Sequence, residues 1–271
     1  MLRMKDVRLK AFLEGLYFVY NRRELVNPDP LAFLYAYDDP LDREIAGLIA
    51  SCLAYGRVSQ IMKSVERALA PLGQHPHSFL LRGKPSRLLF QGFKHRFTTG
   101  EQIADLLDRI SDALQEHGSL EALMKSCLRK SGAFLPALVL FSRALEPLEN
   151  SKEKFPLLAA PDGGSACKRL LLYLKWMVRR DEVDPGCWTV FSPKDLIMPT
   201  DTHVHNIALH LGFTKRRQAN LKTALEITEN FARLTPEDPT RYDFSLTRFG
   251  IRGALQISEL WDALGEVYFS A

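Results

Sequence analysis

The sequence contains no long apolar run. No part of its 271 residues approaches the roughly 18 consecutive apolar residues that a membrane-spanning helix requires. Its start, "MLRMKDVRLKAF", lacks the apolar segment and the small-residue cleavage site of a signal peptide. We therefore expect no membrane-spanning helix, no membrane partner and a cytoplasmic location.

Cysteines are few and scattered. The four are Cys52, Cys127, Cys167 and Cys187, with no C-x-x-C pair and no tight spacing. Zinc and iron–sulfur sites need cysteines grouped closely along the chain. The sequence therefore predicts no cluster and no zinc, and we expect reduced, mostly buried thiols.

An excess of one charge is also missing. The 36 basic and 32 acidic side chains leave a net charge of only +4. Basic residues nevertheless gather in places, such as "KHR" at 94–96 and "KRR" at 215–217. These clusters fit a phosphate-binding surface, although solvated helix faces have the same composition.

The hydrophobic pattern is helical throughout. Apolar residues recur at helical spacing in nearly every long segment, with glycine and proline between segments. The pattern predicts an all-α protein, and a chain of this length forms one large domain or two smaller ones. We expect helices near 5–20, 42–54, 58–70, 101–116, 119–130, 133–145, 166–180, 202–211, 217–232, 242–250 and 254–268.

Two of these segments are apolar on almost all sides. They cover residues 43–56 and 167–180, and such helices lie at the centre of a fold. The second also carries Lys168, Lys175 and Arg179, which fall within about 40° of one another on a helical projection. A basic stripe on a buried helix requires polar partners along it.

Lys168 and Asp201 both stand where a helix is predicted to begin. The positive end of the helix dipole disfavours a cation at Lys168, and a nucleophilic amine must be uncharged. Asp201 precedes an apolar helix that Gly212 closes, so it is a predicted N-cap. A solvated lysine and a purely structural cap remain the alternatives, but the second carboxylate oxygen of a cap can also point into a cleft.

Several segments together resemble the helix-hairpin-helix DNA glycosylase superfamily, which includes endonuclease III and the 8-oxoguanine glycosylases. "PDGGSACK" ends in a lysine that opens a buried helix, and "PTDTHV" opens another helix. Residues 42–69 look like the first core helix of the family and the loop after it. Residues 241–253 look like the helix that precedes the cluster cysteines of endonuclease III.

The chain departs from the family pattern at three points. Gly164 and Ala166 stand where the family hairpin has its two glycines, and the iron–sulfur cysteines are missing. The interval of 33 residues between lysine and aspartate is longer than in endonuclease III and similar to the archaeal 8-oxoguanine branch. Where relatives insert glutamine into the base stack, Leu53 or Tyr55 would have to substitute. The segments "GSACKR" and "DTHVH" are similar to those of a bacterial branch described only as glycosylase-like.

The resemblance implies a fold and an activity. Two helical subdomains would flank a cleft: residues 42–190 as a core with a divergent hairpin, and residues 1–41 with 191–271 as the second. The protein would be a monomeric base-excision repair glycosylase with lyase activity at abasic sites. Its partner would be DNA, and its substrate an oxidised purine such as 8-oxoguanine.

The resemblance also implies roles for single residues. Lys168 would attack C1′ of a flipped-out nucleotide, and Asp201 would help to deprotonate it. Backbone groups of Gly163, Gly164 and Ser165 would hold a phosphate and a monovalent cation. The remaining expected cleft residues are Tyr55, Lys175, Trp176, Arg179 and His203. For Lys175 and Arg179 structural ion pairs are the alternative, and for Trp176 core packing.

Other readings stay open. The degraded hairpin favours a nucleic-acid-binding protein of the same fold without catalysis. His203 and His205 could serve a metal-dependent hydrolase, although a two-residue spacing separates them on a helix. In "LLFQGFKHRF", Phe90, Phe93 and Phe97 could stack on bases or form a core stripe.

Overall fold

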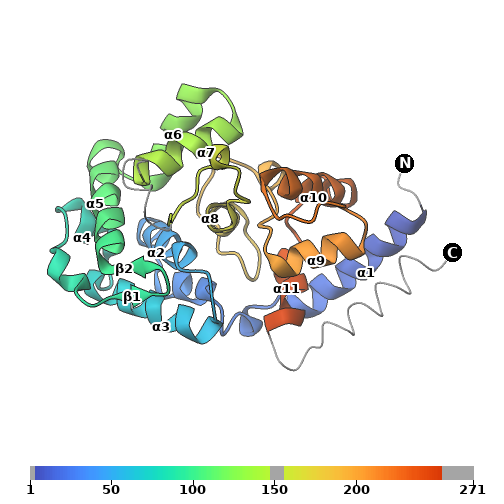
Figure 1. Cartoon of the computed structure of the whole chain (residues 1–271), viewed down its shortest axis with the longest axis horizontal. Coiled ribbons are helices and arrows are strands. Elements are labelled where there is room, and N and C mark those ends of the chain that lie inside the picture. Colours follow the sequence, from blue (N-terminus) through green and yellow to red (C-terminus); the bar gives the residue numbers. More distant parts are fainter. Residues whose placement is uncertain (1–3, 147–155, 252–271) are drawn as a thin grey trace.

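The computed structural model describes residues 4–146 and 156–251, and this part of the chain is mostly helical (Figure 1). The prediction of an all-α protein is confirmed. The α-helices are α1 (Met4–Tyr20), α2 (Pro40–Cys52), α3 (Val58–Leu69), α4 (Pro76–Leu81), α5 (Gly100–His117), α6 (Leu120–Ser131), α7 (Phe134–Leu145), α8 (Lys168–Val178), α9 (Thr202–His210), α10 (Leu221–Leu234) and α11 (Asp243–Ile251). The expected helix over 254–268 lies outside the described residues.

Short elements complete the structure. The 3₁₀ helices are η1 (Arg23–Leu25), η2 (Pro30–Ala36), η3 (Ala70–Leu72), η4 (Arg87–Phe90), η6 (Pro161–Gly163) and η7 (Pro193–Asp195). Strands β1 (Lys94–His95) and β2 (Thr98–Thr99) pair antiparallel in a small hairpin. Within the described residues, no helix combines the length and apolar character needed to cross a membrane.

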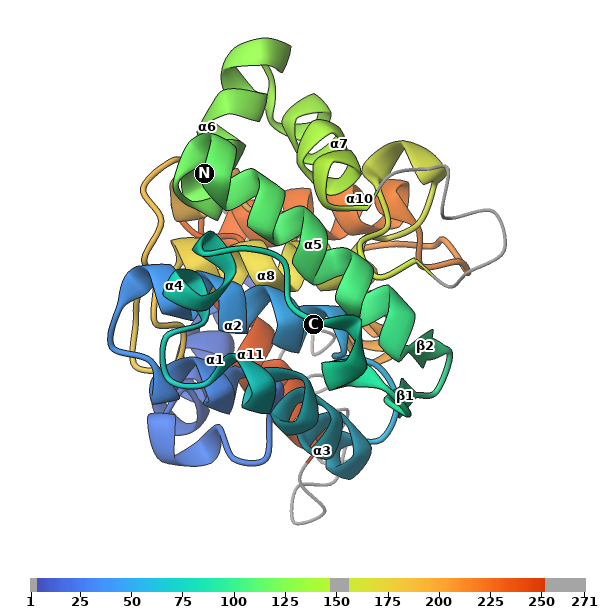
Figure 2. The same ribbon diagram turned by 90° about the vertical axis from the view of Figure 1, so that its left-hand side faces the viewer.

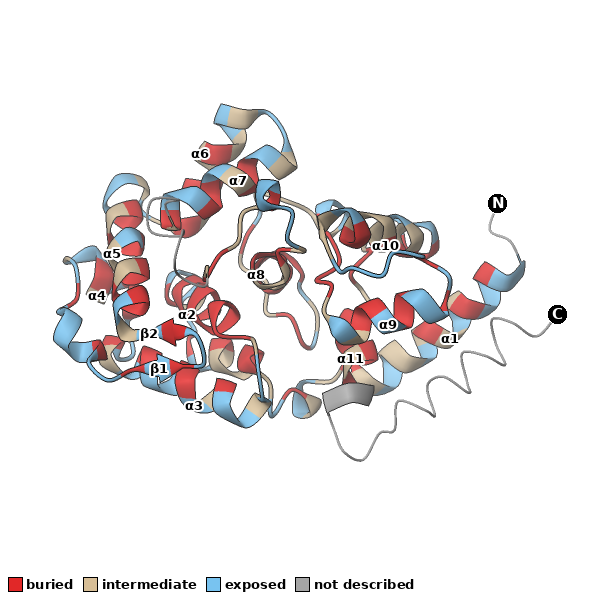
Figure 3. Ribbon diagram, viewed as in Figure 1, coloured by how far each residue is buried: buried red, intermediate tan, exposed pale blue. Residues whose placement is uncertain are grey.

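Helix α8 lies at the centre of the molecule, as its composition predicts (Figure 1). Eight of its eleven residues are buried, and ten of the thirteen residues of α2 are buried beside it (Figure 3). A Cβ built on Gly47 of α2 would lie 2.9 Å from Met177 Cε and 3.4 Å from the Tyr173 ring. Glycine at position 47 therefore allows the two central helices to approach closely.

The buried apolar side chains form two clusters. The first gathers around α8 and includes α2 to α7, with α3, α4 and α5 forming an outer wall (Figure 2). The second joins α1, α9, α10 and α11. Val26, Leu31, Leu34 and Tyr37 pack in the first cluster. The expected division into residues 42–190 and residues 1–41 with 191–271 stays a prediction.

Two helix starts differ from the expected ones for local reasons. Cys167 has a left-handed backbone with φ 49°, so α8 begins at Lys168 rather than at residue 166. The side chain of Asn220 accepts a hydrogen bond from the Thr223 N–H, so α10 begins at Leu221 rather than at residue 217. The first difference places Lys168 at the first residue of α8.

Candidate active site

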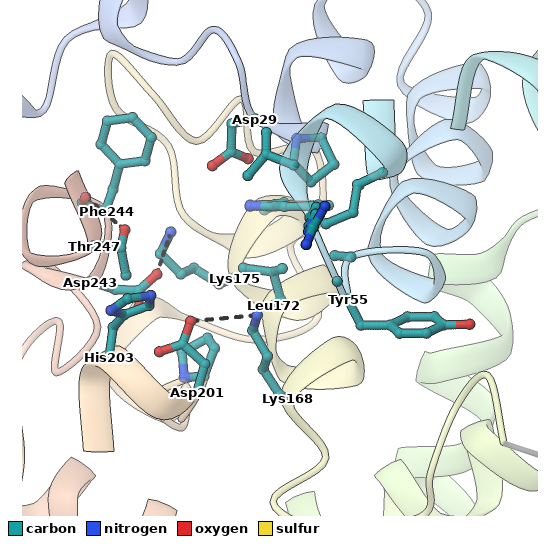
Figure 4. A pocket seen from close by; sticks show the side chains of 18 residues that line it. Asp29, Tyr55, Lys168, Leu172, Lys175, Asp201, His203, Asp243, Phe244 and Thr247 are labelled. Atoms are coloured by element: carbon teal, nitrogen blue, oxygen red, sulfur yellow. Dashed lines mark hydrogen bonds and ion pairs between the residues drawn. The ribbon is translucent and has the colours of Figure 1, made fainter. Parts of the chain in front are cut away.

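A cleft of about 410 Å³ lies between the two clusters. Its walls come from the start of η2, the turn between α2 and α3, one face of α8, the entrance to α9 and the start of α11 (Figure 4). A second cavity of about 400 Å³ adjoins it and shares Tyr55, Lys168, Asp201 and His203. Segments far apart in the sequence therefore meet at one accessible site.

Asp201 is both a helix cap and a cleft residue. Its Oδ1 accepts a hydrogen bond from the Val204 N–H at 2.9 Å, which confirms the predicted N-cap of α9. Its Oδ2 lies 3.5 Å from Lys168 Nζ (Figure 4). The two oxygens therefore have separate partners, one structural and one across the cleft.

Lys168 begins α8 and reaches toward Asp201 from the opposite wall. Its side chain is 35% exposed and that of Asp201 is 22% exposed. The pair lies in the lining of both cavities. A molecule bound in either cavity can therefore reach the amine.

Lys175 lies two turns further along the same face of α8, in a different environment. Its side chain is 1% exposed, with Nζ 3.2 Å from Asp184 Oδ1 and 3.1 Å from Asp243 Oδ2. Burial lowers the pKa of Lys175, but the charges of Asp184 and Asp243 outweigh it and hold the pKa above its ordinary value. Lys175 borders the cleft as a paired cation.

Arg179 continues the basic stripe below Lys175. Its guanidinium contacts Asp184, Asp181 at 2.9 Å and Asp238 at 2.9 Å, and its side chain is 3% exposed. Burial lowers the pKa of Arg179, but the three carboxylates outweigh it and raise the pKa above its ordinary value. Arg179 does not line the cleft. Its contacts are those of a structural ion pair, the alternative considered for this residue.

Tyr55 lines the cleft and is held there by the β-hairpin. Its hydroxyl donates to the His95 carbonyl oxygen at 2.8 Å and lies 2.8 Å from Thr98 Oγ1. The Arg169 guanidinium lies 5.2 Å from the centre of its ring. Leu53, the other residue considered for insertion into a base stack, is fully buried and cannot reach a ligand.

Trp176 and His203 also line the cleft. Trp176 is 2% exposed and packs in the first cluster, so it contributes little surface to the cavity. His203 points into the cleft beside Asp201 (Figure 4). His205 is buried instead, with Nε2 2.8 Å from the Arg216 carbonyl oxygen. The two histidines therefore do not face one ligand.

The glycine turn before α8 is exposed but differently arranged from the expected phosphate cradle. The N–H groups of Gly163 and Gly164 donate to the carbonyl oxygens of Ala160 and Pro161. Ser165 Oγ accepts a hydrogen bond from the Cys167 N–H at 2.9 Å. The N–H groups of Gly163 and Gly164 are therefore occupied in this conformation, and a monovalent cation on the carbonyls stays a prediction.

The three phenylalanines of "LLFQGFKHRF" differ in burial, so the core stripe describes two of them and only one is exposed for stacking. Phe90 and Phe93 are buried in the first cluster, whereas Phe97 is 62% exposed at the β-hairpin. Arg96, beside it, has φ 52°, and a Cβ built on Gly56 would lie 2.7 Å from Arg96 Cδ. The hairpin therefore presents an exposed aromatic and a cation next to the cleft turn.

The sequence did not identify the acidic partners of the basic stripe. Asp184 follows α8 in the long loop before α9, and Asp243 begins α11. Asp243 lines the cleft with its side chain 7% exposed. One signal in the sequence could have identified Asp243. Like Asp201, it is an acid at the start of a predicted helix, where the helix dipole favours a carboxylate.

No metal site is evident in the described part of the chain. Residues 4–146 and 156–251 contain no group of three or more histidine, cysteine, aspartate or glutamate side chains that could hold a metal ion. Cys52, Cys127 and Cys167 are buried, Cys187 is half-buried, and all four are free thiols. The expectation that the thiols are mostly buried is confirmed.

Comparisons with known proteins place the chain in a family. No match was found among curated proteins or among solved structures. The family model described as "Protein of unknown function (DUF2400)" matches residues 29–252. This range covers more than half of the chain and includes both Lys168 and Asp201, so the chain belongs to the DUF2400 family.

Proposed function

We propose that this protein is a DNA glycosylase with lyase activity at abasic sites, and that its fold is a divergent form of the helix-hairpin-helix glycosylase fold. The proposal rests on one observation: the accessible amine of Lys168 faces the carboxylate of Asp201 at 3.5 Å across a cleft. The sequence resemblance assigns the nucleophile and its helper to these same two residues. Their positions were predicted separately, and they lie 33 residues apart in the sequence.

The geometry supports nucleophilic catalysis by an amine. Lys168 Nζ forms a bond to C1′ of the nucleotide while the bond between C1′ and the base breaks. Asp201 Oδ2 accepts a proton from the attacking nitrogen and stabilises positive charge on the sugar. The sugar ring then opens to a Schiff base with Lys168, from which β-elimination cleaves the strand.

The surroundings of the cleft fit a nucleic acid. Arg57 lines the cleft and is exposed, and Arg96 lies against the same turn. Arg169 lines the second cavity, and the exposed residues 215–217 precede Ala219, which also lines it. Cations of this kind hold phosphates, and exposed aromatics such as Phe97 stack on bases.

The cleft has room for one flipped-out base. Pockets for small ligands span roughly 300 to 1,000 Å³, and the cleft of about 410 Å³ is within this range. Apolar and aromatic groups from Trp176, Leu172 and Phe244 line it beside the polar groups. We propose an oxidised purine such as 8-oxoguanine as the substrate.

Borohydride trapping tests the proposal. The protein is incubated with duplex DNA that carries an abasic site, in the presence of sodium borohydride, which reduces a Schiff base to a stable covalent adduct. We expect an adduct with the wild-type protein and none with Lys168→Ala. An adduct of equal yield with Lys168→Ala would show that another amine reacts.

DNA binding without trapping would favour the non-catalytic alternative. A binding protein would show salt-dependent affinity for DNA, since phosphate contacts release counterions. It would also bind equally well after Asp201→Asn and give no adduct on any DNA. This pattern would contradict the proposed reaction.

A further inference from the structure

Asp243 differs from every other buried carboxylate around α8. It lies at the first residue of α11 and lines the cleft with its side chain 7% exposed. Its Oδ2 binds Lys175 Nζ at 3.1 Å (Figure 4). Its Oδ1 has no hydrogen-bond partner in the described part of the chain. This oxygen also keeps some surface exposed to solvent. This oxygen is therefore available to a molecule in the cleft.

The buried network that contains Asp243 has more carboxylates than cations. Two cations, Lys175 and Arg179, contact four carboxylates. The carboxylates are Asp181, Asp184, Asp238 and Asp243. With all six groups charged, the network would carry two uncompensated negative charges, and two of its carboxylates, Asp184 and Asp243, are buried, where unpaired charge is costly. A proton on one carboxylate lowers this cost.

The hydrogen bonds show which carboxylate can hold that proton. Both oxygens of Asp184 bind cations, Oδ1 to Lys175 and Oδ2 to Arg179. Both oxygens of Asp181 accept hydrogen bonds from N–H or O–H groups. Asp238 likewise accepts at both oxygens. Among the oxygens of these four carboxylates, only Oδ1 of Asp243 has no partner in the described part of the chain, and Asp243 lines the cleft.

We propose that Asp243 is a second catalytic residue of this site, a protonated carboxyl that donates its proton to the departing base. The inference rests on the proposed glycosylase function. As the C1′–N bond breaks, its electron pair moves to the base, and the proton on Asp243 Oδ1 passes to a ring nitrogen or carbonyl oxygen of that base. Lys168 supplies the new bond to C1′ and Asp201 takes up the proton that Lys168 loses. Asp243 recovers its proton from water after the base leaves.

The electrostatics around Asp243 agree with this role. Burial raises the pKa of Asp243 above its ordinary value, against the charge of Lys175, and the charges of Asp201 and Asp184 raise it further. The other nearby acids bind their own cations: Asp29 contacts Arg248 and Glu14 contacts Arg241. Burial also raises the pKa of Asp184, but both oxygens of that carboxylate bind cations. A general acid must hold a proton to donate, and a raised pKa is the direction that this role requires.

Infrared spectroscopy tests the proton directly, without a substrate. A protonated carboxylic acid has a C=O stretching band that a carboxylate lacks. We expect this band in the wild-type protein at pH 7 and its loss in Asp243→Asn. Asp238→Asn is the matched control, because it removes one carboxylate from the same network away from the cleft. Burial raises the pKa of Glu44 to about 7, so the comparison is made in a Glu44→Gln background. In that background, a spectrum without the band, or a band that persists when Asp243→Asn is added, would overturn the inference.

Single-turnover kinetics test the catalytic role. On a duplex with 8-oxoguanine, we expect Asp243→Asn to release the base about 100-fold more slowly or worse, the range for loss of a general acid. On a preformed abasic site no base leaves, so borohydride trapping by Asp243→Asn should match the wild type. The fall of the wild-type excision rate at high pH should be absent in Asp243→Asn.

The two failures can be told apart. If the wild type forms no adduct on abasic DNA, the proposed function fails whatever Asp243 does. If the wild type forms the adduct but Asp243→Asn excises at the wild-type rate, the assignment of Asp243 is wrong. Equal losses of trapping and excision in Asp243→Asn would show a structural role and would also overturn it.

Discussion

Lys168 and Lys175 lie on the same face of α8, two turns apart, in opposite environments. Lys168 is 35% exposed and has one carboxylate partner at 3.5 Å, whereas Lys175 is 1% exposed and has two partners at 3.2 and 3.1 Å. A surface pair contributes little to stability, while a buried cation is fixed by its partners. One helix face therefore carries an available amine at its start and a fixed cation in its interior.

The same division applies to the acids. Asp201 shares its oxygens between a backbone N–H and the accessible amine, whereas Asp184 is fully buried and binds two cations. Asp243 lies between these cases because it binds Lys175 and also borders the cleft. Chemistry is expected where a group that is fixed by one partner also faces the cleft.

The largest difference should appear in stability when each lysine is replaced by methionine. Lys175→Met takes from Asp184 one of its two cations and from Asp243 its hydrogen-bond donor, both in a buried environment, so we expect a loss of roughly 3 kcal/mol in the free energy of unfolding. Lys168→Met removes a partly exposed pair and should cost about 1 kcal/mol or less. Urea unfolding at pH 7 measures both, and equal losses would contradict the comparison.

Acid should weaken the buried part of the stripe. Burial raises the pKa of Asp181, but Arg179, two backbone N–H groups and Tyr17 outweigh it and lower the pKa to about 2. A lowered folded-state pKa stabilises the protein above the ordinary value near 4 and loses this contribution as the pH falls toward 2. The loss should be roughly 2 kcal/mol. Denaturant unfolding between pH 5 and 2 should show it in the wild type and not in Asp181→Asn.

Two substitutions at Asp201 separate its structural role as the N-cap of α9 from its proposed catalytic role. Asp201→Ala removes the acceptor for the Val204 N–H and should cost about 1 kcal/mol. Asp201→Asn keeps an N-cap acceptor, so its stability should remain near that of the wild type. Both variants should lose base excision, because neither has the carboxylate. Normal excision by Asp201→Asn would limit Asp201 to a structural role.

The smallest effect on stability is expected at His203. It lines the cleft without a hydrogen bond to another described residue, so His203→Ala should change the free energy of unfolding by about 0.5 kcal/mol or less. DNA affinity should fall, because the imidazole borders both cavities. His205→Ala is the contrasting variant, since it removes the group bonded to the Arg216 carbonyl and should lower stability more. The opposite order of stability losses would contradict this placement.

The sequence predicted the long helices because each has several turns of periodic apolar residues. It also placed Lys168 and Asp201 at helix starts, since caps and first-turn residues have local signals. The β-hairpin escaped prediction because two-residue strands are too short to show alternation. Helix α4 also escaped prediction, because its six residues form less than two full turns and show no clear periodicity.

The partners of the basic stripe could not be predicted from local pattern. The stripe itself required polar neighbours, but Asp184 and Asp243 approach α8 through the folded chain and belong to different segments. The glycine turn shows the same limit, because its composition does not reveal that the N–H groups of Gly163 and Gly164 are already bonded. Tertiary pairing decides both features.

Mapping the borohydride adduct tests the central claim most directly. The wild-type protein is trapped on abasic DNA, digested with a protease, and the modified peptide is sequenced by mass spectrometry. The amine at the exposed start of α8 should react and the buried amine should not, so the modification is expected on Lys168. A modification on Lys175 or on another lysine, or no adduct at all, would contradict the account.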